Sequence, residues 1–151
     1  MRVLPRLLAT TLLILAAGCD TPLEAVQLTI GHRLHPGFKE TQRVRPGEKF
    51  QIGDSELYGR VVDFIPDFAY DDKAKKVVSR SKELRNPAIK IEVWDEAKGK
   101  KVEDAWALTA AMPHFSAASQ LSFHVDSLLW KPGMDPAAAA VADTSEGRNT
   151  P

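Results

Sequence analysis

The feature that most constrains the fold is an alternation of apolar and polar residues with a period of two. It is clearest in the stretch AIKIEVWD, where Ile89, Ile91 and Val93 face one way and the intervening side chains face the other. Successive side chains of a β-strand point to opposite faces, so this pattern predicts strands with one buried face. The same alternation occurs in AVQLTIG, EKFQIG and QLSFHVDSLLW.

Three further extended stretches, ELYGRVVDFIPDFAYD, KKVVSRS and KVEDAWALTA, bring the expected number of strands to about seven. Turn residues separate these strands, and no segment has a convincing helical pattern with caps. We therefore predict an all-β fold, an antiparallel β-sandwich or an open barrel. Pro66 interrupts the longest stretch, which predicts an edge strand or a bulge at that point.

The N-terminal segment has the composition of an export signal. Arg2 and Arg6 precede the apolar run LLATTLLILAA, and small residues follow it. A basic start, a short apolar run and a small-residue end are typical of a secretory signal peptide, here residues 1–18. The run is too short for a membrane-spanning helix, which needs roughly 20 residues.

The end of this segment, Ala16-Ala17-Gly18-Cys19, resembles the lipobox of bacterial lipoproteins. The resemblance implies that Cys19 receives a diacylglyceryl group and becomes the new N-terminus after cleavage. Two or more acyl chains hold a protein stably on a membrane. Asp20 resembles the signal that keeps some lipoproteins on the inner membrane, so we expect the protein at its periplasmic face. Cys19 is the only cysteine, so no thiol is left for a disulfide, a metal or a nucleophile.

The rest of the chain divides into a short linker (19–21), a β-rich domain (22–130) and a tail (131–151). The tail, KPGMDPAAAAVADTSEGRNTP, has no apolar periodicity and is expected to be disordered. The whole chain has 20 basic and 20 acidic residues. The expected partners are the membrane, through the lipid anchor, and another envelope protein. Nucleic acid is not among them.

Part of the β-rich segment contains a series of short elements, namely Val62-Asp63-Phe64, Tyr70-Asp71, Val77–Ser81, Asn86-Pro87 and the strand and turn of Ile89–Lys100. This series resembles the extracytoplasmic β domain of ResB-type cytochrome c biogenesis proteins. The Asn-Pro precedes the long strand here, whereas the family tends to place it after the following hairpin. The resemblance implies a role in cytochrome c maturation or haem handling, with haem as the candidate cofactor.

Histidines are the candidate haem or metal ligands. His32 and His35 form a His-x-x-His motif after the first strand, next to the turn-forming Gly31, Pro36 and Gly37, and the other two histidines are His114 and His124. Imidazoles at this spacing can share a metal, or one can ligate haem. Met112 near His114 is another pairing found at haem and copper sites. The alternative is a surface loop with two solvated histidines.

A basic stretch is the candidate membrane or partner surface. Residues 73–101 contain ten basic and four acidic residues. Its candidate contact residues are Lys73, Lys75, Lys76, Arg80, Lys82 and Arg85. Such a surface could lie against anionic headgroups, and the alternative is a pair of charged edge strands that discourages aggregation. The acidic residues before and around it are expected to be solvated: Asp54, Glu56, Asp63, Asp67, Asp71 and Asp72.

The sequence lacks the usual catalytic motifs, with no Gly-x-Ser-x-Gly, phosphate loop or His-Glu-x-x-His. We therefore expect a binding protein rather than an enzyme, with three alternatives. Haem handling requires a histidine beside an apolar pocket, with Arg or Lys for the propionates. Docking of another envelope protein requires an exposed apolar patch or a free strand edge, for example around Trp94 and Trp106. Metal binding requires further ligands close to His32 and His35.

Overall fold

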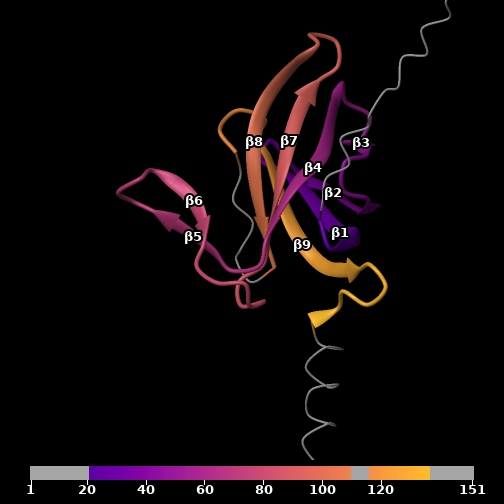
Figure 1. Cartoon of the computed structure of the whole chain (residues 1–151). Coiled ribbons are helices and arrows are strands. Elements are labelled where there is room, and N and C mark those ends of the chain that lie inside the picture. Colours follow the sequence, from indigo (N-terminus) through magenta and orange to yellow (C-terminus); the bar gives the residue numbers. More distant parts are fainter. Residues whose placement is uncertain (1–20, 110–115, 137–151) are drawn as a thin grey trace, which may run out of the picture.

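A computed structural model describes residues 21–109 and 116–136, and these residues form an all-β, antiparallel fold (Figure 1). The fold class expected from the alternation is therefore confirmed. Nine strands lie within the described residues. They are β1 (Leu23–His32), β2 (His35–Val44), β3 (Lys49–Gln51), β4 (Leu57–Ile65), β5 (Phe68–Asp71), β6 (Lys76–Ser79), β7 (Ala88–Asp95), β8 (Lys100–Leu108) and β9 (Leu121–Trp130).

Two sheets enclose the core, and a separate hairpin projects from them. The first sheet has the order β2-β1-β9 and the second β3-β4-β7-β8. β8 lies beside β9 at one edge, and at the other the Gln42 side chain donates a hydrogen bond to the backbone oxygen of Gln51 in β3. The arrangement is thus a sandwich whose edges approach each other. β5 and β6 form a two-stranded arm that stands away from both sheets (Figure 1).

The core consists of the side chains that the alternation places on one face of each strand. Ile89, Ile91 and Val93 of β7 are fully buried, as the pattern predicted. Leu28 and Ile30 of β1 face them from the other sheet and are equally buried. The same cluster contains Val26, Val44, Phe50, Ile52, Val61, Leu121, Phe123 and Val125.

The two strands beyond the expected seven have clear physical causes. β2 was not predicted because it is an edge strand whose residues, apart from Val44, are at most half-buried and mostly polar. The long stretch around Pro66 is two strands rather than one: β4 ends at Ile65 and β5 begins at Phe68. A β-bulge between Val61 and Asp63 accompanies this break.

Several expectations concern residues outside the described ranges. The signal segment, Cys19 and His114 belong to these residues, as does the tail from residue 137 onward. The first tail residue, Lys131, is described, and its backbone N–H donates to the carbonyl of Pro22 at 2.9 Å. The described residues contain no helix that is long and apolar enough to cross a membrane.

Candidate functional site

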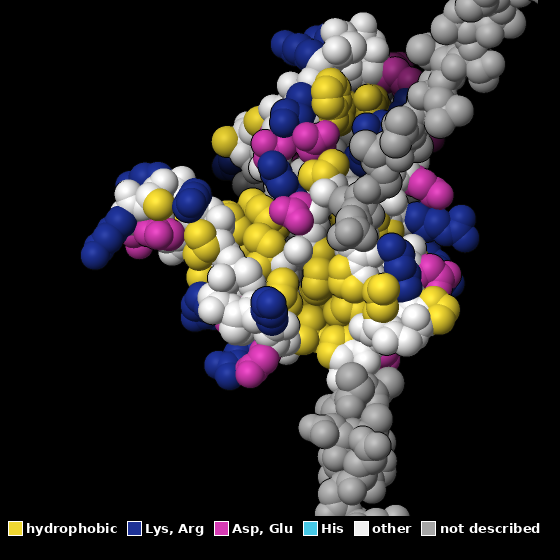
Figure 2. Space-filling model, viewed as in Figure 1, with side chains coloured by type: hydrophobic (Ala, Val, Ile, Leu, Met, Phe, Trp, Pro, Cys, Tyr) yellow, Lys and Arg dark blue, Asp and Glu magenta, His cyan; other side chains and the backbone are white. Residues whose placement is uncertain are grey.

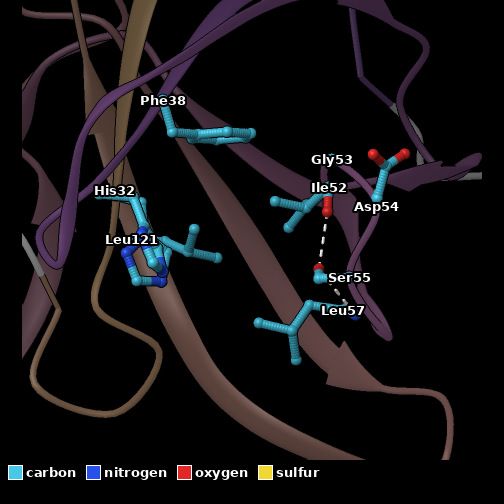
Figure 3. Close-up of a pocket in the computed structure, with 9 residues that line it drawn as sticks. His32, Phe38, Ile52, Gly53, Asp54, Ser55, Leu57 and Leu121 are labelled. Atoms are coloured by element: carbon cyan, nitrogen blue, oxygen red, sulfur yellow. Dashed lines mark hydrogen bonds between the residues drawn. The ribbon is translucent and has the colours of Figure 1, made fainter.

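The His-x-x-His motif lies at the opening of an apolar pocket of about 470 Å³ between the two sheets (Figure 3). The first sheet contributes the ends of β1, β2 and β9, and the second contributes the turn between β3 and β4. The pocket is lined by His32, His35, Phe38, Ile52, Gly53, Asp54, Ser55, Leu57 and Leu121. The fold thus places two of the four candidate histidines, His32 and His35, at one site.

The two histidines are held together by a tight hairpin. His32 ends β1 and His35 begins β2, and the two are register partners, with a turn of only Arg33 and Leu34 between them. Their ring centroids are 4.8 Å apart. The expected turn is therefore present. It consists of Arg33 and Leu34 alone, and Pro36 lies outside it, within β2. His35 is exposed, while His32 is half-buried.

The hydrogen bonds of the turn distinguish the two imidazoles. The backbone N–H of Leu34 donates to Nδ1 of His32 at 3.1 Å. A neutral imidazole that accepts at Nδ1 carries its proton on Nε2, so the remaining nitrogen of His32 is a donor. His35 forms no hydrogen bond with the described residues. Neither tautomer of His35 is fixed by a contact, so either of its nitrogens can serve as the acceptor, and this makes it the better ligand of the pair.

The opposite wall of the pocket is a turn fixed by its own hydrogen bonds. The Ser55 hydroxyl donates to the carbonyl of Ile52 at 2.6 Å, and the Ile52 N–H donates to the carbonyl of Leu57 at 3.1 Å. Gly53 has a φ of +54°, and an added Cβ would lie 2.9 Å from the ring of Phe38. Only glycine fits this conformation beside that ring without strain. Gly53 therefore lets the turn approach Phe38 closely where both residues line the pocket.

Two exposed charged residues lie in the turns that border the pocket. Arg33 lies in the turn between the two histidines, is exposed, and is anchored by its N–H, which donates to the carbonyl of Gln120 at 2.8 Å. A guanidinium here can pair with a ligand's carboxylate. Asp54 is the acidic side chain of the lining and is exposed, so it stays solvated rather than competing for the pocket interior.

His124 does not belong to this site. It lies on the outer face of the first sheet, next to Phe123 whose side chain points into the core. Its Nε2 is 3.9 Å from Asp126, and its buried Nδ1 has no hydrogen-bond partner within the described residues. Within those residues no group of three or more His, Cys, Asp or Glu side chains could hold a metal ion. The described part of the chain therefore gives the metal alternative no further ligands.

The candidate basic surface coincides with the projecting β5–β6 arm and the loop that follows it (Figure 1). Three of its six residues are in ion pairs. These pairs are Arg80–Asp67 at 2.9 Å, Arg85–Glu83 at 2.5 Å and Lys75–Asp72 at 4.0 Å. Lys73, Lys76 and Lys82 are exposed and form no ion pair within the described ranges. They are the residues of this surface that are free to meet a partner.

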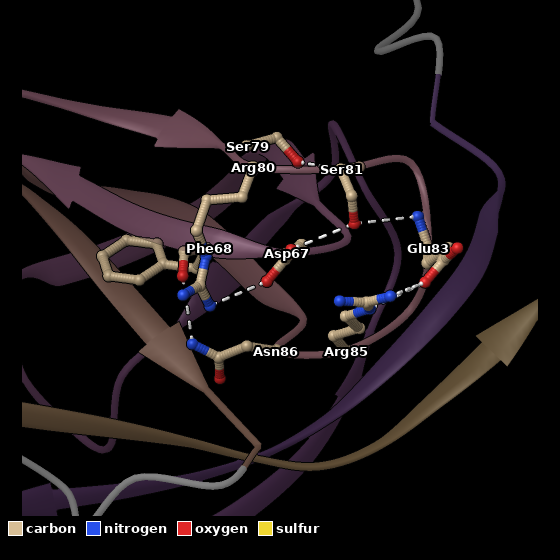
Figure 4. Close-up of polar contacts among 8 residues, drawn as sticks. All are labelled: Asp67, Phe68, Ser79, Arg80, Ser81, Glu83, Arg85 and Asn86. Atoms are coloured by element: carbon tan, nitrogen blue, oxygen red, sulfur yellow. Dashed lines mark hydrogen bonds and ion pairs between the residues drawn. The ribbon is translucent and has the colours of Figure 1, made fainter.

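The expectation that Asp67 is solvated is wrong. Asp67 is buried at the base of the arm, where Arg80 donates to one carboxylate oxygen and the Ser81 hydroxyl donates to the other at 3.0 Å (Figure 4). Asn86 closes the base by donating its amide to the carbonyl of Phe68 at 3.1 Å. Buried carboxylates need such partners. The acidic run of the sequence thus contains a structural residue that its composition did not reveal.

The two tryptophans proposed for docking lie at opposite ends of the outer face of the second sheet. Trp94 stacks on Tyr58, with ring centroids 6.4 Å apart and planes 8° apart, whereas Trp106 packs against Phe68 at 5.5 Å. Both tryptophans are half-buried rather than freely exposed. Each tryptophan therefore packs against a second aromatic ring and keeps part of its surface exposed.

A charged network separates these aromatic pairs. Lys101 donates to Asp104 at 3.0 Å and to Glu92 at 3.3 Å, and Lys90 lies 3.5 Å from Asp104. The hydrogen bonds to Asp104 and Glu92 raise the pKa of Lys101. Partial burial opposes ionisation of Asp104, but the bond from Lys101 and the charge of Lys90 outweigh it, and its pKa is lowered. These are the contacts of a structural cross-strand network.

No protein-family model matches the chain, and no curated protein or solved structure matches it either.

Proposed function

We propose that the chain is a lipid-anchored envelope protein whose β domain binds haem in the pocket beside His32 and His35. In this proposal Cys19 carries the lipid, and the domain stands at the periplasmic face of the inner membrane. The mode of action is binding, as an accessory to cytochrome c maturation or haem handling, without catalysis. The resemblance to ResB-type proteins supports the choice of haem among apolar ligands.

The observation that carries this proposal is the pair of imidazoles at the opening of an apolar pocket. Ligand sites are typically concave and apolar, with a few convergent polar groups that set orientation. Phe38, Leu57 and Leu121 supply the apolar walls, and the histidine pair supplies the nitrogen donors. Haem combines an apolar ring with two carboxylates and an iron that accepts imidazole, so its chemistry matches this set of groups.

The residues have distinct roles in the proposed site. His35, whose nitrogens are unoccupied, ligates the iron. His32, already bonded to Leu34 through Nδ1, positions the turn and donates from Nε2. Arg33 pairs with a propionate outside the pocket.

The test is a haem titration of the chain that begins at Asp20, followed by absorbance in the Soret region. That chain contains all nine strands and the complete core. We expect a saturable shift that is lost in His35→Ala and weakened in His32→Ala. His124→Ala is the matched control, because it removes a half-buried histidine from the same sheet but outside the pocket, and it should titrate like the wild type. His114→Ala completes the set.

A shift that survives in both His32→Ala and His35→Ala would refute this site, as would the absence of any shift in the wild type. In the second case docking of another envelope protein becomes the function to test. Lipid attachment is tested separately, by incorporation of labelled palmitate in cells. Label should be present in the wild type and absent from Cys19→Ser.

A further inference from the structure

Thr21 lies at the end of the domain that follows Cys19 in the chain. Thr21 is buried, and the backbone there is secured on both sides. The carbonyl of Pro22 accepts from Lys131, and Leu23 pairs with Trp130, the last residue of β9. Only Asp20 stands between Cys19 and Thr21, and two residue steps span at most about 7 Å. A lipid on Cys19 would thus hold this end of the domain at the membrane surface.

Aromatic side chains gather at this same end. Phe64 packs edge-on against Trp130, with ring centroids 5.7 Å apart, and the Phe68–Trp106 pair follows just past the end of β4. Figure 2 shows hydrophobic atoms exposed as a continuous area between the arm and the end of β9. Tryptophan and tyrosine favour the interface between lipid and water.

Exposed apolar side chains follow the same distribution. Four large hydrophobic residues are exposed within the described ranges. Tyr70 lies on the arm, Leu84 in the loop after it, and Met134 just after β9, while only Leu34 lies in the histidine turn at the pocket. Isolated exposed apolar residues need no explanation. Three of the four, however, lie on the arm, in the loop after it or just after β9, and one lies at the pocket.

The arm adds positive charge. Lys73 and Lys76 lie in its tip and Lys82 in the loop at its base, all exposed and outside any ion pair of the described residues. Each lysine near an anionic membrane surface contributes about 1 kcal/mol, which is about fivefold in partitioning.

We propose that this anchor-side face, made of the arm, the loop 82–86 and the two aromatic pairs, lies on the headgroups of an anionic membrane. The lipid on Cys19 and this face then act as two signals, one covalent and one electrostatic. The lipid holds the protein on the bilayer, and the face sets its orientation. This orientation rests on the anchor of the proposed function but not on haem.

The test is co-sedimentation of the chain that begins at Asp20, without its lipid, with vesicles of neutral lipid or of neutral lipid containing about a third anionic lipid. We expect binding to the anionic vesicles that weakens with salt, because exposed charges are screened. Replacing Lys73, Lys76 and Lys82 together by Gln should weaken binding by roughly a hundredfold at low salt, at about fivefold for each lysine.

The matched control replaces Lys39, Lys98 and Lys100 by Gln. It makes the same change in charge at exposed positions away from the face, and its binding should equal that of the wild type. Equal loss in both triple variants, or equal binding to neutral and anionic vesicles, would overturn the orientation. The absence of vesicle binding would also overturn it and favour an acidic partner protein. None of these outcomes depends on the haem titration or on palmitate labelling.

A fluorescence measurement separates the face from general adsorption. Trp106 and Trp130 lie at the anchor side, and Trp94 lies at the far end of its sheet. In a Trp94→Phe chain, vesicles should still shift the emission to the blue. An unchanged spectrum on bound vesicles would place the contact elsewhere and refute the proposed face.

Discussion

The packing of Phe50 over Gly59 gives the sharpest test of how the second sheet is built. The two residues are register partners in β3 and β4. A Cβ added at Gly59 would lie 2.2 Å from Cζ of Phe50 and within 2.8 Å of both Cε atoms. A Cβ atom essentially never lies within 3.0 Å of another heavy atom, so in Gly59→Ala the buried ring must move by about 1 Å or more. Overpacking of this kind costs about 1–3 kcal/mol.

The assay is thermal and urea unfolding of the chain that begins at Asp20. For a domain of this size, 2 kcal/mol lowers the melting temperature by roughly 6–10 °C. The control is Gly37→Ala, because nothing lies within 4 Å of the Cβ position there, and it should change stability by less than about 0.5 kcal/mol.

A double-mutant cycle tests the cause. In a Phe50→Leu background the shorter side chain leaves room, so Gly59→Ala should cost clearly less than in the wild type. If the two substitutions add within about 0.5 kcal/mol, they do not interact, and the steric reasoning is refuted. Because β3 and β4 carry the turn 52–57 that forms one wall of the pocket, a confirmed cycle would also tie that wall to this packing.

Three further predictions concern the arm and the charged network. Lys75 has a φ of +52°, so Lys75→Gly should stabilise the arm by about 0.5 kcal/mol. The strain relieved at this left-handed position is larger than the chain entropy that glycine adds to the unfolded state. Faster amide exchange in the arm would contradict this. Asp67→Ala should weaken the arm's base by about 1–3 kcal/mol, since Arg80 loses its buried acceptor, and trypsin should cut the arm faster; an unchanged rate would contradict it. The pKa of Lys101 is raised above 10.5. The stability that its ion pairs contribute is therefore complete below pH 10.5 and is lost as the pH rises through the folded-state pKa. Lys101→Met should therefore flatten the fall of melting temperature above about pH 10.5. The lowered pKa of Asp104 makes its contribution to stability disappear only on the acid side, as the pH falls through that pKa.

The fold class was predictable because one physical rule, burial of one face of each strand, leaves its period directly in the sequence. β7 shows this best: Ile89, Ile91 and Val93 are buried as the alternation requires. The rule fails for the edge strand β2, because its inward positions include the polar Glu40 and Gln42 beside Phe38 and Val44. Without an apolar alternation, its residues were not predicted to form a strand. Pro66 was read correctly as an interruption, but the number of strands on either side of it depended on the fold.

The candidate site was predictable only in part, because a site is made by convergence. The motif His32–His35 was visible, but its pocket is completed by the turn around Ile52 and by Leu121, which no local pattern connects. Likewise, Asp67 was counted with its solvated neighbours, since burial beside Arg80 comes from the folding of the arm. The separation of His124 from the other pair followed from its position opposite the buried residues of β9.

The two proposed surfaces are related by a single strand. β1 runs from Leu23, beside the proposed anchor, to His32, at the pocket, and its nine residue steps span about 30 Å. A membrane that holds the anchor-side face therefore leaves the pocket open to the aqueous side, where a soluble ligand or a partner protein could reach it. Footprinting with vesicles tests this division directly. Anionic vesicles should protect the arm from trypsin at Lys73 and leave the rate of His35 modification by diethyl pyrocarbonate unchanged. Protection of His35 would mean that the pocket faces the membrane, and the orientation inferred from the anchor would be wrong.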